Sequence, residues 1–92
     1  MTTQTMQTLG EFMTRCKPNT VLDIFFKTAN GEDTIPPELS DRPTAQQLLD
    51  NTYLNGLTID HRDHFANIRI SSGWNIYINQ EFDQKAFTGN AN

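Results

Sequence analysis

Hydrophobic and polar residues alternate from Phe65 to Asn79, a pattern typical of a β-hairpin with one apolar and one polar face. We predict a three-residue loop, Ser71-Ser72-Gly73, in which Gly73 takes a positive φ. This register pairs apolar residues on one face, namely Ile70 with Trp74, Ile68 with Ile76 and Ala66 with Ile78. It pairs polar residues on the other face, namely Asn67 with Tyr77 and Arg69 with Asn75. A two-residue loop would mix the faces, so the pattern selects this register and predicts a polar binding platform.

A second alternating segment, Thr20–Thr28, predicts a strand whose buried face carries Leu22, Ile24 and Phe26. The following Asn30-Gly31 predicts a type I′ turn, which would pair Phe26 with Ile35 before two prolines end the returning strand. Val21 and Phe25 lie on the second face of the strand. Either a helix or a chain end covers them, or they form a patch for a partner, and coverage is favoured because exposed apolar patches are uncommon on monomers.

The segment after Thr8 has the spacing of an amphipathic helix. Thr8 and Glu11 form a capping box at its start, and Pro18 ends it. Its apolar stripe consists of Leu9, Phe12, Met13 and Cys16. This stripe is expected to pack on the sheet, with Cys16 as a small buried hydrophobic side chain.

A second capping box, at Thr44 and Gln47, begins a helix that we expect from about Ala45 to Leu54, with Gly56 as its C-cap. A short closing helix is predicted over Glu81–Phe87. The order helix, hairpin, helix, hairpin predicts an α+β fold, in which two or three short helices pack on a small antiparallel sheet of two hairpins. With 92 residues the chain is long enough for one compact domain, 1–92, whose ends (about 1–4 and 88–92) are expected to fray.

Composition limits the classes of function. The formal net charge is −4 and the seven basic residues are scattered, which argues against direct binding of free DNA and against a basic recognition helix. Such a charge either steers the protein towards a basic partner or serves solubility alone. A lone cysteine fits a reducing cytosol, and neither a signal peptide nor an apolar run of membrane-spanning length is seen. The chain is therefore expected in the cytoplasm and away from membranes.

The segment Asp60-His61-Arg62-Asp63-His64 concentrates side chains capable of chemistry. It could bind a divalent metal, form a solvated turn or contact a partner, and the turn is favoured because zinc ligands usually come from two separate segments. The letters HRD lack the rest of a kinase signature, and no phosphate-binding glycine loop or nucleophile elbow is present. We therefore predict no catalytic residue, no metal and no cofactor.

Two segments, TLGEFMTRCKPNTVLDIFFKTANGED and FANIRISSGWNIYINQEF, resemble the phage anti-CRISPR proteins that act on type I-F systems, specifically the eighth family of that group. The resemblance implies a non-catalytic inhibitor in the host bacterial cytoplasm. Such an inhibitor binds the type I-F surveillance (Csy) complex, contacts its Cas proteins and its guide RNA, and blocks pairing with target DNA.

The resemblance supplies no motif at residue level, so the contact residues are inferred from the chain itself. The predicted partner-binding residues are Glu32, Asp33, Arg62, Asn67, Arg69, Asn75 and Tyr77. Trp74 is expected in the core rather than against a nucleic-acid base, because the register places it on the apolar face. The alternative function is a small metal-binding enzyme or regulator that uses the Asp60–His64 segment.

Overall fold

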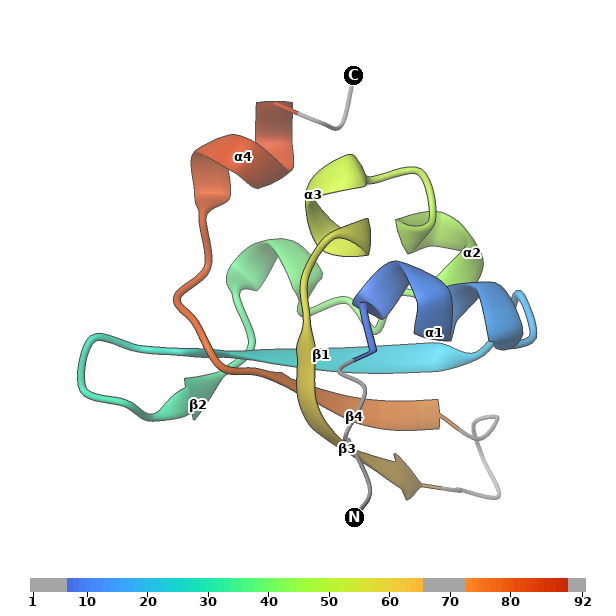
Figure 1. The fold of residues 1–92 in the computed structure, drawn as a ribbon, viewed down its shortest axis with the longest axis horizontal. Coiled ribbons are helices and arrows are strands. Elements are labelled where there is room, and N and C mark those ends of the chain that lie inside the picture. Colours follow the sequence, from blue (N-terminus) through green and yellow to red (C-terminus); the bar gives the residue numbers. More distant parts are fainter. Residues whose placement is uncertain (1–6, 66–72, 90–92) are drawn as a thin grey trace, which may run out of the picture.

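A computed structural model describes residues 7–65 and 73–89, which form a four-stranded mixed sheet and four short helices (Figure 1). The elements in chain order are α1 (Leu9–Arg15), β1 (Val21–Lys27), β2 (Asp33–Thr34), the 3₁₀ helix η1 (Pro37–Leu39), α2 (Ala45–Leu48), α3 (Thr52–Asn55), β3 (Ile59–Phe65), β4 (Gly73–Ile78) and α4 (Gln84–Gly89). The strand order is β2-β1-β4-β3, and the helices lie on one side of β1 and β4. No helix in these described ranges is long and apolar enough to cross a membrane.

The α+β class predicted from the sequence is confirmed. The pairs β1–β2 and β3–β4 are antiparallel, as expected for two hairpins. The hairpins join through a parallel pair, β1–β4, so the sheet is mixed and not wholly antiparallel. This pairing is possible because the chain after β2 crosses through the helical layer before β3 and then β4 return to the sheet.

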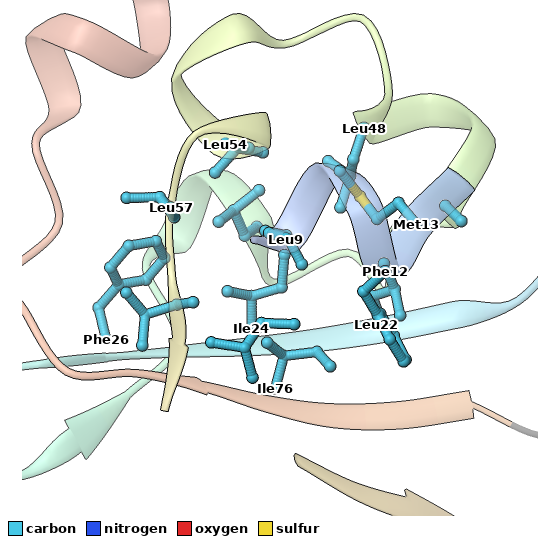
Figure 2. Packing of buried hydrophobic residues seen from close by; sticks show 14 residues of the cluster. Leu9, Phe12, Met13, Leu22, Ile24, Phe26, Leu48, Leu54, Leu57 and Ile76 are labelled. Carbon is cyan, nitrogen blue, oxygen red and sulfur yellow. The ribbon is translucent and has the colours of Figure 1, made fainter. Parts of the chain in front are cut away.

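The hydrophobic core lies between the helices and one face of the sheet (Figure 2). The sheet contributes completely buried side chains from alternate positions, namely Leu22, Ile24 and Phe26 of β1 and Ile76 of β4. The helices contribute Leu9, Met13 and Leu54, each fully buried. The predicted alternation in β1 is confirmed, because burial follows every second residue along the strand.

The helix α1 begins as its sequence predicts and ends at Arg15, so that Cys16 is its C-cap and not part of the helical stripe. The Thr8 hydroxyl accepts from the Glu11 amide, and the Glu11 carboxylate accepts from the Thr8 amide at 3.0 Å, which confirms the capping box. These bonds from Thr8 also hold the pKa of Glu11 below its usual value. Cys16 is half-buried against the core, and burial raises the pKa of its thiol.

The turn between β1 and β2 differs from the predicted type I′ turn. Phe26 is opposite Thr34 and not Ile35. Gly31 has a φ of 82°, its amide donates to the Thr28 carbonyl at 2.8 Å, and the Thr28 amide donates to the Glu32 carbonyl. Because Gly31 is the residue of this turn with positive φ, the turn is a three-residue loop with a glycine bulge, the geometry predicted from the sequence for the other hairpin.

The single helix predicted over Ala45–Leu54 is two short helices, α2 and α3. The capping box of Thr44 and Gln47 begins α2, as predicted. Asn51 then begins a new helix, because its side chain accepts from the Leu54 amide at 3.1 Å and donates to the Phe87 carbonyl at 3.1 Å. This buried amide ties α3 to α4, and Gly56 is the C-cap of α3 as expected.

The second hairpin uses different residues from those predicted. The strand β3 consists of Ile59–Phe65, so the Asp60–His64 segment is a strand and not a solvated turn. Trp74 is opposite His64, Asn75 opposite Asp63, Ile76 opposite Arg62, Tyr77 opposite His61 and Ile78 opposite Ile59, which replaces the predicted register. Gly73 begins β4 and does not have positive φ. Residues 66–72, which include the predicted loop serines and Ile68, Ile70, Asn67 and Arg69, lie outside the described residues.

The predicted placement of Trp74 in the core and the closing helix are confirmed. Trp74 is half-buried against the core, with its ring edge-to-face on Phe12 at 5.3 Å between centroids. The closing helix α4 begins at Gln84 and not at Glu81, because the Asp83 carboxylate accepts from the Ala86 amide before the first turn. Phe82, directly before Asp83, and Phe87, within α4, pack against the core.

Candidate functional site

One face of the sheet points away from the helices (Figure 1). The side chains that alternate to this face are not members of the hydrophobic core. We call this face the open face. Alternation and strand register place on it Val21, Asp23, Phe25, Lys27, Asn75, Tyr77, His61, Asp63 and Phe65. The described helices lie on the other side of the sheet, so the predicted cover of Val21 and Phe25 by a helix is wrong for these helices (Figure 1). The other predicted cover, a chain end, lies outside the described residues, at 1–6 and 90–92.

A β-bulge in β3 decides which side chains reach the open face. Ile59 is opposite Ile78 and buried, and His61 is opposite Tyr77, so Asp60 between them is the extra residue of the bulge. Without the extra residue, alternation would place His61 opposite Ile76, on the side of the core. The bulge therefore moves the His61 imidazole to the open face.

Three aromatic rings, one each from β1, β4 and β3, stack side by side across the sheet. Phe25 and Tyr77 have centroids 4.8 Å apart and planes inclined by 12°, and Tyr77 and His61 have centroids 4.2 Å apart and planes inclined by 10°. The three residues are direct neighbours in register, and strands lie about 4.8 Å apart, so the sheet itself sets the spacing of the rings. We call Phe25, Tyr77 and His61 the aromatic ladder.

A row of polar side chains runs beside the aromatic ladder. Asp23, Asn75 and Asp63 are neighbours in register on β1, β4 and β3. Neither carboxylate of this row has a hydrogen bond or ion pair within residues 7–65 and 73–89. Asp60 lies at the end of the ladder, with Oδ2 3.0 Å from Nδ1 of His61. The open face is therefore acidic next to its aromatic rings.

The charge at the other end of the open face is balanced. Nζ of Lys27 lies 2.8 Å from Oδ1 of Asp33, and both side chains are about one-third exposed. Beyond the polar row, Val21, Gly73 and Phe65 form a further row in register. A Cβ on Gly73 would lie 2.5 Å from Cζ of Phe65, so glycine is needed there for the ring to lie across the strand.

The remaining side chains of the Asp60–His64 segment point to the opposite side of the sheet. The Arg62 guanidinium lies over the rings of Phe12, at 5.1 Å, and Trp74, at 5.7 Å, and it donates to Gln7 Oε1 at 3.2 Å. The His64 ring lies edge-to-face on Trp74. His61 and His64 are thus on opposite faces, and in the described part of the chain no three His, Cys, Asp or Glu side chains gather as a metal site would require.

The structure brings together some of the predicted partner-binding residues. Asn75 and Tyr77 lie on adjacent rows of the open face, and Asp33 lies at its Lys27 end. Glu32 is exposed in the β1–β2 loop, and Arg62 is on the side of the helices. Asn67 and Arg69 lie outside the described residues.

The predicted partner-binding residues did not include Asp23, Phe25, His61 or Asp63, although Val21 and Phe25 were placed on a second strand face that could form a patch for a partner. The alternation in Thr20–Thr28 was the available signal for Phe25 and Asp23, since it placed both on the second face of the strand. No local signal showed that this strand would pair with β4, and that pairing is what brings Phe25 to Tyr77.

Comparison with protein-family models, curated proteins and solved structures finds no match for the chain.

Proposed function

We propose that the protein is a non-catalytic inhibitor that binds the type I-F CRISPR surveillance (Csy) ribonucleoprotein complex in the cytoplasm of a host bacterium. In this proposal it contacts Cas subunits and guide RNA and thereby blocks pairing of the guide with target DNA. The binding role is carried by the open face, where an aromatic ladder lies beside a polar row that contains two carboxylates, Asp23 and Asp63. The partner is suggested by the resemblance of the two sequence segments to type I-F inhibitors.

Two properties of the open face support binding by occupancy. Its side chains are presented by paired strands over a packed core, so little conformational entropy is lost on binding. Its carboxylates complement lysine and arginine, which line channels that hold nucleic acid. An acidic protein in such a channel would take the place of the phosphates of target DNA.

The proposal is tested by binding of the protein to the purified type I-F complex, measured by surface plasmon resonance with and without bound target DNA. We expect tight binding to the free complex and strongly reduced binding to the DNA-saturated complex. Undiminished binding to the DNA-saturated complex would refute blocking of target DNA. No binding to the free complex would refute the proposed partner.

Substitutions distinguish charges that steer association with the complex from side chains that contact it directly. Glu32→Lys reverses a charge on an exposed loop, so it should slow association and weaken its dependence on salt, while Tyr77→Leu should mainly speed dissociation because it removes the central ring of the ladder. Glu38→Lys is the matched control for charge, since Glu38 is exposed in η1, on the side of the helices. If Glu38→Lys and Glu32→Lys slow association equally, net charge alone accounts for the steering.

A further inference from the structure

We propose that the open face binds an arginine side chain of a partner protein, whose guanidinium stacks on His61 as the next member of the aromatic ladder. The carboxylates of Asp60 and Asp63 would hold its charge. The inference deepens the proposed function and rests on it, because it names the chemistry by which the inhibitor holds its partner.

The outer end of the aromatic ladder is accessible. β3 is the last strand of the sheet in the order β2-β1-β4-β3. At the start of its outer edge the Ile59 amide donates to the Gln7 carbonyl, and His61, two residues further along, is the ladder residue on this strand. The His61 side chain is 54% exposed, and no ring in the described residues stacks on its outer side. The inner end, at Phe25, lies on a strand within the sheet and is half-buried.

The charges around His61 select a cation. Asp60 lies against the imidazole at 3.0 Å and is 45% exposed. Asp63 is two residues further along β3 on the same face, and within the described chain it has no ion-pair partner. A nucleotide stacked on His61 would bring its phosphate close to both carboxylates, which is electrostatically unfavourable. The ring therefore favours a positively charged ligand over a nucleic-acid base.

The geometry selects arginine over lysine. The ladder presents parallel rings at a regular spacing, and a guanidinium is planar, so it can continue the stack. The same group donates two parallel hydrogen bonds to a carboxylate, while an ammonium group does neither. A partner protein is the source of such a side chain, and the basic groove of a nucleoprotein complex is rich in them.

The first test uses a soluble probe and does not require the complex. A peptide of alternating arginine and glycine is added to the ¹⁵N-labelled full chain, with a lysine–glycine peptide of equal length and an oligouridine RNA as comparisons. We expect the arginine peptide to perturb the amides of His61, Asp63 and Tyr77 and to bind about two- to fivefold more tightly than the lysine peptide. The RNA should leave these amides unchanged.

Matched variants localise the effect. His61→Ala should abolish the preference for arginine over lysine, and Asp63→Asn should weaken both peptides by about two- to fivefold. His64→Ala removes an exposed imidazole from the other face of the same strand and should keep the preference. Asp50→Asn makes the same charge change at an exposed site next to α2 and should bind like the wild type.

Three results would overturn the inference. They are equal affinity of the wild type for both peptides, perturbations centred on the helices, and perturbation of the ladder by the RNA. The second test measures the same variants on the type I-F complex, where His61→Ala should speed dissociation and His64→Ala should not. If the wild type does not bind the complex but prefers the arginine peptide at His61, the result contradicts the proposed function and supports the arginine site on the open face. If His61→Ala and Asp63→Asn bind the complex as tightly as the wild type does, the result contradicts the arginine site on the open face and supports the proposed function.

Discussion

At Gly31, alanine should destabilise the protein more than asparagine does. At Gly73, asparagine should destabilise it at least as much as alanine does. Gly31 has a φ of 82°, and a Cβ added to it would meet nothing within 4 Å. Gly73 does not have positive φ, but its Cβ would lie 2.5 Å from both Cζ of Phe65 and the carbonyl oxygen of Val21. Backbone conformation therefore explains the first glycine, and close approach of neighbouring chains explains the second.

The magnitudes follow from these two causes. At Gly31 alanine should cost about 1–2 kcal/mol, the penalty of an L-residue in the left-handed region, and asparagine should cost less because it tolerates this region. At Gly73 a contact of 2.5 Å is more than 1 Å closer than carbon atoms normally approach, so strand and ring must move, at about 1–3 kcal/mol for alanine. Asparagine adds further atoms at the same place and should cost at least as much as alanine.

Equilibrium unfolding in urea, with the slope compared among variants, measures all four free energies of unfolding. The double variant Gly73→Ala with Phe65→Ala should recover part of the interaction cost, because the ring is gone while the Val21 carbonyl remains. If asparagine at Gly73 is clearly more stable than alanine, Gly73 has positive φ and the close-approach explanation is wrong.

Three further substitutions test the core, the helix break and one cap. Ile76→Ala should cost about 2–5 kcal/mol in urea unfolding, because Ile76 is fully buried; a loss below about 1 kcal/mol would contradict its place in the core. Asn51→Ala should cost about 1–3 kcal/mol by leaving the Leu54 amide and a carbonyl of α4 unpaired, and hydrogen exchange should rise in both α3 and α4; protection unchanged in α4 would refute the link. The pKa of Glu11 is lowered on folding, so its carboxylate stabilises the fold above about pH 4.5, and this contribution is lost as the pH falls through the folded pKa. The difference in Tm between wild type and Glu11→Gln should therefore shrink in acid, and a constant difference would contradict the cap.

Elements defined by neighbouring residues were predicted well. The capping boxes at Thr8 and Thr44 and the alternation in β1 are signals within a few residues, and all three are confirmed. The break at Asn51 has a local signal too, because asparagine is a preferred N-cap residue, but the apolar stripe continued past it and favoured one helix. The two capping boxes thus located the starts of α1 and α2, and Gly56 located the end of α3, whereas the start of α3 at Thr52 and the start of α4 at Gln84 were not predicted.

Strand pairing was predicted less well, for a physical reason. Residues 66–70 alternate in hydrophobicity and so predict a strand, whereas β3 carries charged or imidazole side chains at five consecutive positions from Asp60 to His64. An outer strand tolerates such a sequence, since one edge and parts of both faces contact water, and charged side chains there discourage pairing with other molecules. Alternation therefore identified the inner strand of the hairpin, β4, and misidentified its partner.

The open face depends on two features that no local pattern encodes. The parallel pairing of β1 with β4 brings Phe25 to Tyr77, and the bulge at Asp60 turns His61 to the same side. Both are consequences of the core, because Ile24 is opposite Ile76 and Ile59 is opposite Ile78 on the buried side of the same strands. A slip of one residue in either pair would bury polar groups and expose these isoleucines, so the packing that holds the sheet in register also holds the three rings in line. The side chains of the open face are therefore positioned by buried residues on the other side of the sheet, which is why the sequence predicted Tyr77 and Asn75 individually but neither the ladder that contains Tyr77 nor the polar row that contains Asn75.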